Sequence, residues 1–191
     1  MPAPRVSGRE KWKYKKWFTV LSPSILGEIP IATIPADDSS KILNRSIEVT
    51  LYDLTGDVSQ LHMRFILKII GVEDSTARTA FREVYLSRDY LRSLTKRKSS
   101  KISLIANLET KDGSKLRISA VAFTTYTCKT SQKKLIRRNM YNVISEISKQ
   151  STLDEIIKDV ISGKIQSQLF EVAKKIYPVR KVEIAKIKIL S

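Results

Sequence analysis

Basic side chains recur at intervals of four residues in residues 87–101. Arg88, Arg92 and Lys96 fall on one stripe when this stretch is placed on a helix with about 100° per residue. The opposite side is apolar, through Tyr90, Leu91 and Leu94. Guanidinium and ammonium groups donate charge-assisted hydrogen bonds to phosphate oxygens. The stretch therefore predicts a helix that docks through its apolar side and leaves its basic side free to bind a polyanion.

The whole chain is basic, but the excess charge is concentrated. Its 191 residues include 35 Lys and Arg against 19 Asp and Glu, a formal net charge of +16. Four segments each carry about +5, and the rest of the chain is slightly acidic: residues 1–18, 87–101, 129–138 and 174–188. Such clustering is typical of nucleic-acid binding, because the release of counterions from phosphates supplies affinity. The alternative is that these segments are solvated faces that only aid solubility.

The predicted RNA-binding residues are the cations of these segments and the aromatic residues interleaved with them near the N-terminus. They are Lys11, Trp12, Lys13, Tyr14, Lys15, Lys16, Trp17, Arg88, Arg92, Lys96, Arg97, Lys98, Lys101, Lys129, Lys133, Lys134, Arg137, Arg138, Lys174, Lys175, Arg180 and Lys181. Flat rings between cations suit a phosphate backbone together with stacking on exposed bases, and Tyr90 is a further stacking candidate. An equally weighted alternative is that Trp12, Trp17 and Phe18 pin the tail to the folded body.

Catalytic sites are hard to assemble from this sequence. His62 is the one histidine and Cys128 the one cysteine, so the chain can form neither a histidine-based triad nor a His/Cys zinc cluster. Its six glycines form no phosphate-binding loop motif. Asp53 and Asp57 are typical of a turn rather than of a magnesium site. We expect no enzyme, no cofactor, no metal site and no small-molecule substrate.

The single cysteine also rules out an intramolecular disulfide, which favours a reducing compartment. No apolar run reaches the length of a membrane span, and the N-terminus lacks the apolar core of a signal peptide. We therefore expect a soluble cytoplasmic protein with no membrane partner.

Alternating apolar and polar residues predict strands at 47–52, 61–72, 76–86, 102–110, 115–122 and 182–189. Asp112-Gly113 predicts a hairpin turn, and a slip of phase near Ala185 predicts a β-bulge in the last strand. Residues 19–38 contain three prolines and are interpreted as loop with brief strands.

Helical periodicity and capping residues predict a basic helix near 87–97 and C-terminal helices near 131–148, 153–162 and 164–176. Ser87 is expected to cap the first of these, and Thr152 with Glu155 forms a capping box for the third. The predicted fold is α+β with a mainly antiparallel, barrel-like sheet. A basic aromatic tail, residues 1–18, precedes a single RNA-binding domain, residues 19–191.

Basic segments spread over a tail, two helices and a C-terminal segment do not resemble DNA readers that insert one recognition helix. They favour folded RNA that is bound through its backbone and shape. A second hypothesis is a protein–protein adaptor whose main contact is the acidic helix 152–163, through Asp154, Glu155 and Asp159.

Several stretches in the same order resemble one known family along nearly the whole chain. They are Arg45, Glu48, Leu51 and Asp53-Leu54-Thr55-Gly56-Asp57; Arg88-Asp89-Tyr90-Leu91-Arg92-Ser93-Leu94; Thr130-Ser131-Gln132-Lys133; and Tyr177-Pro178-Val179-Arg180-Lys181-Val182-Glu183-Ile184. The family is the S3Ae small-subunit ribosomal proteins of archaea and eukaryotes. Its members usually have glycine where this chain has Asn44, a branched apolar residue at Ser46, and Ser or Cys at Thr50. The chain lacks the longer terminal extensions of eukaryotic members, so it resembles the archaeal ones.

This resemblance implies a structural component of the 30S-type ribosomal subunit, a cytoplasmic ribonucleoprotein that acts in translation. It implies a position on the platform near the messenger exit, close to the 3′ end of the small-subunit ribosomal RNA. Neighbouring ribosomal proteins of the platform would be its protein partners, and contact with messenger RNA stays open.

Overall fold

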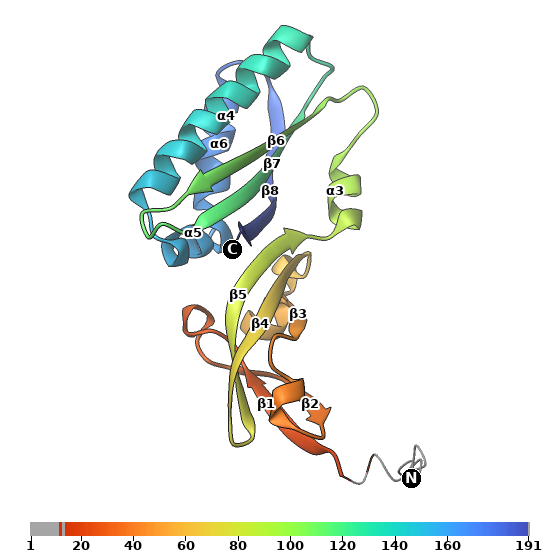
Figure 1. Ribbon diagram of the computed structural model, residues 1–191. Helices are drawn as coiled ribbons and strands as arrows, with labels where there is room; N and C mark the ends of the chain where they lie inside the picture. Colours follow the sequence, from red (N-terminus) through yellow and green to blue (C-terminus); the bar gives the residue numbers. More distant parts are fainter. Residues whose placement is uncertain (1–11, 13, 191) are drawn as a thin grey trace, which may run out of the picture. The chain divides into compact units, whose positions relative to one another are not determined.

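The computed structural model describes residues 12 and 14–190 (Figure 1). The chain divides into two compact units, which are described separately. The first comprises residues 1–58 and 65–82, and the second comprises residues 59–64 and 83–191. Two long strands, β4 (Met63–Glu73) and β5 (Thr76–Leu86), contribute to both units.

The first unit is built on strands β1 (Lys16–Leu21), β2 (Pro30–Ala36) and β3 (Ser46–Thr50). Strand β1 pairs antiparallel with β2 and parallel with β5, and β3 pairs with β4. One core cluster of this unit consists of Phe18, Val20, Ala36, Ile42, Ile69 and Ala77. Short 3-10 helices occur in this unit at Ser24–Leu26 and Ser39–Lys41, and a third, Val58–Gln60, spans the boundary with the second unit.

Strands β1 and β2 take up half of residues 19–38, which the sequence predicts to be loop with brief strands. Strand β2 contains Pro30 and Pro35 and is the last strand of the sheet on its side. A missing backbone N–H is tolerated there because edge strands leave one row of donors unpaired.

A short helix, α2 (Leu51–Thr55), replaces the turn predicted after β3. The backbone N–H of Thr50 donates to Asp53 Oδ2 (3.0 Å), and the backbone N–H of Asp53 donates to Thr50 Oγ1 (3.3 Å). These bonds form a capping box. The Thr50 hydroxyl also donates to Asp53 Oδ2 (2.7 Å), and this bond, together with the one from the Thr50 backbone N–H, holds the pKa of Asp53 below its ordinary value. Asn44 has φ +65°, a conformation that favours glycine and that asparagine tolerates best among the other residues. The glycine expected there from the family is thus replaced by the residue that fits the same backbone.

In the second unit, strands β6 (Lys101–Glu109), β7 (Lys115–Thr124) and β8 (Val179–Leu190) form an antiparallel sheet. The end of β5 pairs with β8. Gly113 has φ +76° in the turn between β6 and β7, as the predicted hairpin requires. The β7–β8 register skips Ala185, so the predicted bulge is confirmed.

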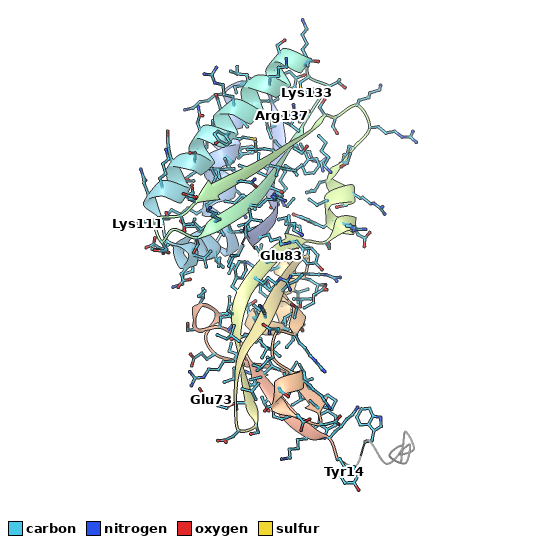
Figure 2. The ribbon with its side chains drawn as sticks, viewed as in Figure 1. Tyr14, Glu73, Glu83, Lys111, Lys133 and Arg137 are labelled. Carbon is cyan, nitrogen blue, oxygen red and sulfur yellow. The ribbon has the colours of Figure 1, made fainter. Side chains whose placement is uncertain are left out.

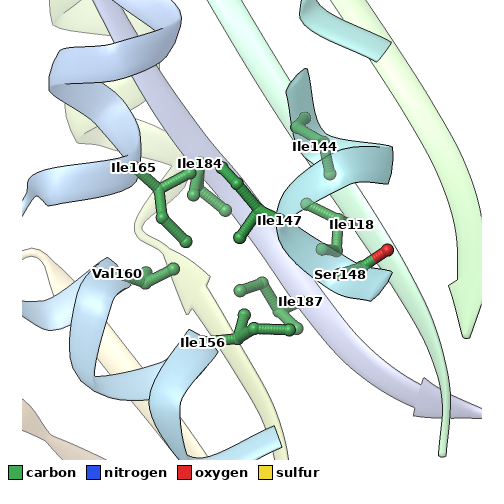
Figure 3. A pocket seen from close by; sticks show the side chains of 9 residues that line it. All are labelled: Ile118, Ile144, Ile147, Ser148, Ile156, Val160, Ile165, Ile184 and Ile187. Atoms are coloured by element: carbon green, nitrogen blue, oxygen red, sulfur yellow. The ribbon is translucent and has the colours of Figure 1, made fainter. Parts of the chain in front are cut away.

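Helices α4 (Thr130–Gln150), α5 (Leu153–Ile161) and α6 (Lys164–Lys174) cover one face of this sheet (Figure 1). Apolar side chains from all three helices and from β7 and β8 meet in the core (Figure 3). Only about 10 Å³ of space is left among them, and eight of the nine residues around it are isoleucine or valine. The remaining one, Ser148, donates its hydroxyl hydrogen to the Ser145 carbonyl (3.2 Å).

The opposite face of the sheet carries helix α3 (Arg88–Leu94). Leu94 packs with Val121 and Phe123, and Tyr90 and Leu91 lie against them. Val121 and Phe123 alternate along β7 with the residues under α4 to α6, so α3 lies on the other side of the strand. The apolar side of α3 therefore anchors the helix, as the sequence predicts.

The predicted fold class is confirmed: α+β, with an eight-stranded, mostly antiparallel sheet. The described strands form an open sheet rather than a closed barrel. The three C-terminal helices begin and end close to their predicted bounds. Within the part of the chain that the structure describes, no helix is long and apolar enough to span a membrane. The same residues contain no cluster of three or more potential metal ligands.

Candidate nucleic-acid interface

The first basic segment presents its rings to solvent. Trp12, Tyr14 and Trp17 have exposed fractions of 57%, 75% and 61%, and Figure 2 labels Tyr14. Phe18, by contrast, is a core residue of the first unit with 4% exposure. The two alternatives raised by the sequence therefore apply to different rings: Phe18 anchors the segment, and the other three are exposed. Lys15 Nζ lies over the Trp12 ring, 4.0 Å from its centroid. Lys11 and Lys13 lie outside the described residues.

Helix α3 presents Arg88 and Arg92, but it is shorter than predicted. The hydroxyl of Ser87 accepts from the backbone N–H of Tyr90 (3.4 Å), and the helix ends at Leu94. Lys96 therefore lies beyond the predicted stripe. Arg88 and Arg92 instead line a shallow hollow of about 190 Å³ with Lys101 from β6, together with Leu91 and Thr95.

The turn after α3 holds the remaining cations of the second segment. The Ser99 hydroxyl accepts from the backbone N–H of Lys96 (3.3 Å) and donates to the Lys96 carbonyl (2.6 Å). Lys98 adopts a positive φ of 60°. These local bonds compete with helical ones and account for the early end of α3. Lys96, Arg97 and Lys98 are all exposed on this turn.

Tyr90 is a packing residue in this structure, not the free stacking platform that the sequence suggests. Its ring stacks on His62, with the centroids 3.9 Å apart. Its hydroxyl donates to Glu183 Oε1 (3.0 Å) and accepts from Lys181 Nζ, which also pairs with Glu183 at 2.8 Å. Burial raises the pKa of Tyr90. These contacts tie α3 to β8.

Lys181 is consequently less available to RNA than its sequence suggests. Burial works to lower the pKa of Lys181, but its bonds to Glu183 and Tyr90 outweigh burial, and the pKa is raised overall. Among the described residues that were predicted to bind RNA, Lys181 alone forms an ion pair. Paired cations elsewhere in the described chain include Lys41, Arg78, Lys115, Lys164 and Lys186.

The third basic segment lies along α4. Ile136, Met140 and Ile144 are buried, and the basic residues face outward; Figure 2 shows Lys133 and Arg137 along this helix. Arg137 Nε donates to the Ser103 carbonyl on β6 (3.0 Å), which holds the guanidinium beside the sheet. Leu135, which the helical pattern predicts to face inward, is 48% exposed. Its position on the helix falls between the buried stripe and the basic face.

Residues 124–129, here called the junction, connect the second and third basic segments. The backbone N–H of Ser100 donates to Thr124 Oγ1 (2.9 Å), and the backbone N–H of Cys128 donates to Ser100 Oγ (3.2 Å). Thr127 Oγ1 donates to the Lys98 carbonyl (3.1 Å). The junction thus fixes the turn after α3 against the residues that lead into Lys129 and α4.

The fourth basic segment is tied to the same junction. The backbone N–H of Thr125 donates to the Pro178 carbonyl (3.0 Å), and the Tyr177 hydroxyl donates to the Thr127 carbonyl (3.2 Å). Pro178 lies between the C-terminus of α6, with Lys174 and Lys175, and Arg180 on β8. Three basic segments that are 28 or more residues apart in sequence therefore meet at one end of the second unit.

The junction also contributes an aromatic residue that the sequence does not single out. Tyr126 is 65% exposed and lies between the residues that bind Lys98 and those that bind Pro178. A lone tyrosine there carries no signal, because only the long-range hydrogen bonds place it among the basic segments.

Known proteins are similar to this chain along nearly its whole length. The model of the Ribosomal S3Ae family matches residues 5–191. A protein of Staphylothermus marinus is 50% identical over 191 residues, which cover 100% of this chain and 90% of that protein. One from Sulfurisphaera tokodaii is 47% identical over 182 residues (95% and 94%), and one from Aeropyrum pernix is 47% identical over 186 residues (95% and 87%). Each is named small ribosomal subunit protein eS1.

The family model covers nearly all of the sequence, and these archaeal relatives match it at about half of their positions. The chain therefore belongs to the Ribosomal S3Ae family, as an archaeal member.

Proposed function

We propose that this protein, a structural constituent of the small ribosomal subunit and not an enzyme, binds ribosomal RNA through the basic surface around the junction. Its position would be the platform near the messenger exit, close to the 3′ end of the small-subunit RNA. Neighbouring ribosomal proteins of the platform would be its protein partners, with messenger RNA as a further contact. Residues 1–18 would act as a separate basic, aromatic arm that binds RNA.

The convergence of three basic segments on the junction is the observation that carries this proposal. Among the described residues, the cations of α3, its following turn and α4 form no ion pair, whereas Lys41, Arg78, Lys115 and Lys164, outside these segments, are paired with carboxylates. Unpaired clustered cations keep their full attraction for phosphate. A surface that only aided solubility would need no hydrogen bonds to bring its basic segments together.

The junction favours contact with the RNA backbone and shape. The basic residues around it lie on a turn, a helix and a strand start rather than on one helix that could enter a groove. The major groove of an RNA helix is deep and narrow, so proteins bind RNA through phosphates, 2′-hydroxyls and unpaired bases. Cations spread over three elements can bind successive phosphates along a curved strand.

The salt dependence of RNA binding tests this proposal. In one variant, Ala replaces Arg88, Arg92, Lys96, Arg97 and Lys98. The slope of log K against log salt concentration should become less steep by about 0.7–0.9 for each phosphate that these side chains neutralise. The matched control replaces Lys41, Lys115 and Lys164 by Ala, because these lysines are paired with carboxylates. The control should keep the wild-type slope. Equal slopes in all three proteins would show that the basic segment is solvated surface.

The adaptor alternative finds less support in the contacts of α5. Glu155 accepts from the backbone N–H of Thr152 (2.8 Å) as part of the helix cap, and Asp159 pairs with Lys164 at 3.6 Å. Glu155 thus caps its own helix, and Asp159 links α5 to α6. Charge reversal at Asp154, Glu155 and Asp159 that left RNA affinity intact but stopped assembly with neighbouring proteins would favour the adaptor instead.

A further inference from the structure

A groove of about 520 Å³ lies between α6 and β8 in the second unit. Its volume is in the range of small-ligand sites in proteins. Gln166, Phe170 and Lys174 line it from α6, and Arg180, Val182 and Glu183 line it from β8. Lys174 and Arg180 belong to the fourth basic segment, whereas no sequence pattern singles out Gln166 or Phe170.

The groove runs along the edge of β8 rather than over one face of the sheet. Four consecutive residues, Arg180 to Glu183, line it. Successive side chains of a strand point to opposite faces, so only an edge position brings all four to one groove. Strand β8 pairs with β5 through Lys186–Lys188. Over residues 180–183 no described strand pairs with the side away from β7, so backbone donors and acceptors are left there for a ligand.

The walls combine an aromatic ring with unpaired cations. Phe170 is half-buried, and Lys174 Nζ lies 5.9 Å from its ring centroid. Lys174 and Arg180 are exposed, and neither has an ion-pair partner among the described residues. Glu183 is already bound by Lys181 and Tyr90, which leaves Glu171 as the remaining acidic group of the groove. Net charge therefore favours an anionic ligand.

A polar side chain sits in the same wall. Gln166 Nε2 donates to the Val160 carbonyl (2.9 Å), which fixes the orientation of the amide. Its Oε1 is buried and has no hydrogen-bond partner within the described chain. A buried amide oxygen without a partner is uncommon in native proteins, since it loses the hydrogen bonds it would make to water. A small movement of this side chain would offer the oxygen to a donor in the groove.

We propose that this groove holds one unpaired nucleotide of ribosomal RNA. Its base lies against Phe170 and the edge of β8, and its phosphate lies between Lys174 and Arg180. Unpaired bases can stack on aromatic rings and expose their hydrogen-bonding edges, whereas the bases of a duplex are stacked on each other. The inference rests on the proposed function and adds to it a site for a single base beside a surface that binds phosphates.

The test compares two RNAs, an unstructured single strand and a duplex of equal length, by fluorescence anisotropy with the full-length protein. The variant Phe170→Leu keeps an apolar side chain in place and removes the flat ring. This variant should bind the single strand about 5-fold or more weakly, which is the low end of the loss expected when one base loses its stacking ring. Its affinity for the duplex should be unchanged. Phe170→Trp, which keeps a flat ring, should bind the single strand about as well as the wild type does. A purely structural role for Phe170 would not predict this result.

Two further variants separate the phosphate contact from general charge. Lys174→Ala should weaken the single strand, whereas Lys164→Ala, on the same helix but paired with Asp159, should not. Urea unfolding of each variant checks that the fold is kept. If the wild-type protein binds neither RNA, the groove site and the proposed function both fail. If it binds both RNAs but Phe170→Leu weakens both equally or neither, the groove site alone is overturned. Binding of an acidic peptide that depends on Phe170 would likewise overturn it, because the groove would then be a peptide site.

Discussion

Removing the Tyr90 hydroxyl should destabilise the second unit by about 1.5 kcal/mol. This hydroxyl donates to Glu183 at 3.0 Å and accepts from Lys181, and Glu183 is 8% exposed. Hydrogen bonds to charged groups contribute about 1.5–3 kcal/mol, and the lower value applies here because Lys181 is half exposed and stays paired with Glu183. Tyr90→Phe keeps the ring on His62, so the measured change reports the hydroxyl alone.

Urea unfolding followed by circular dichroism measures this effect. With a urea dependence of about 1–3 kcal/mol/M, the midpoint of Tyr90→Phe should fall by about 0.5–1.5 M. Tyr126→Phe is the matched control, because that side chain is 65% exposed and should leave the midpoint unchanged. Since Tyr90→Phe leaves every cation of the basic segments in place, the folded variant should also keep the wild-type salt slope for RNA binding. A midpoint of Tyr90→Phe equal to that of the wild type would refute the claim that this network anchors α3.

Three further predictions concern stability. Asn44→Ala should destabilise the first unit by about 1 kcal/mol and Asn44→Gly should be nearly neutral, because φ at this position is +65°; equal unfolding midpoints for the two variants would contradict this. The pKa of Asp53 and that of Glu155 are both lowered by bonds to their helix caps, so their stabilisation is present above an ordinary carboxyl pKa and is lost as the pH falls through the lowered values. The urea midpoint of unfolding should therefore fall as the pH is lowered below about 4. The double variant Asp53→Asn, Glu155→Gln should show a smaller fall over the same pH range, and an equal fall in the variant and the wild type would contradict this role of the caps. In the core shown in Figure 3, Ile144→Ala should cost about 2–5 kcal/mol, whereas Ser148→Ala should change the free energy of unfolding by less than about 0.5 kcal/mol, because its hydroxyl bonds only to its own helix; a large loss of stability in Ser148→Ala would refute that view.

Local patterns in the sequence predict much of the second unit. The hairpin at Gly113, the cap at Ser87, the capping box at Thr152 and the bulge at Ala185 all depend on residues close together in the chain. Alternation also predicts β5 with its observed bounds, Thr76–Leu86. These features are predictable because their determinants are backbone conformation and the side chains of immediate neighbours.

Long-range contacts account for what the sequence does not show. The sequence predicts brief strands among the prolines of residues 19–38, but only the edge position of β2 explains how that strand accommodates Pro30 and Pro35. Tyr90 resembles a stacking residue in the sequence, but Glu183, 93 residues away, binds its hydroxyl. The junction and the groove depend on segments brought together by tertiary structure. The sequence therefore identifies exposed cations but does not group them into surfaces.

Crosslinking within the purified small ribosomal subunit tests the central claim most directly. Ultraviolet irradiation followed by mass spectrometry would identify which peptides of this chain carry RNA nucleotides. We expect crosslinked nucleotides on residues at or beside the junction, including Tyr126 and Lys129, and from adjacent positions of the small-subunit RNA near its 3′ end. Crosslinks confined to peptides away from the junction, such as those of α5, would contradict the convergence of the three basic segments on one RNA-binding surface.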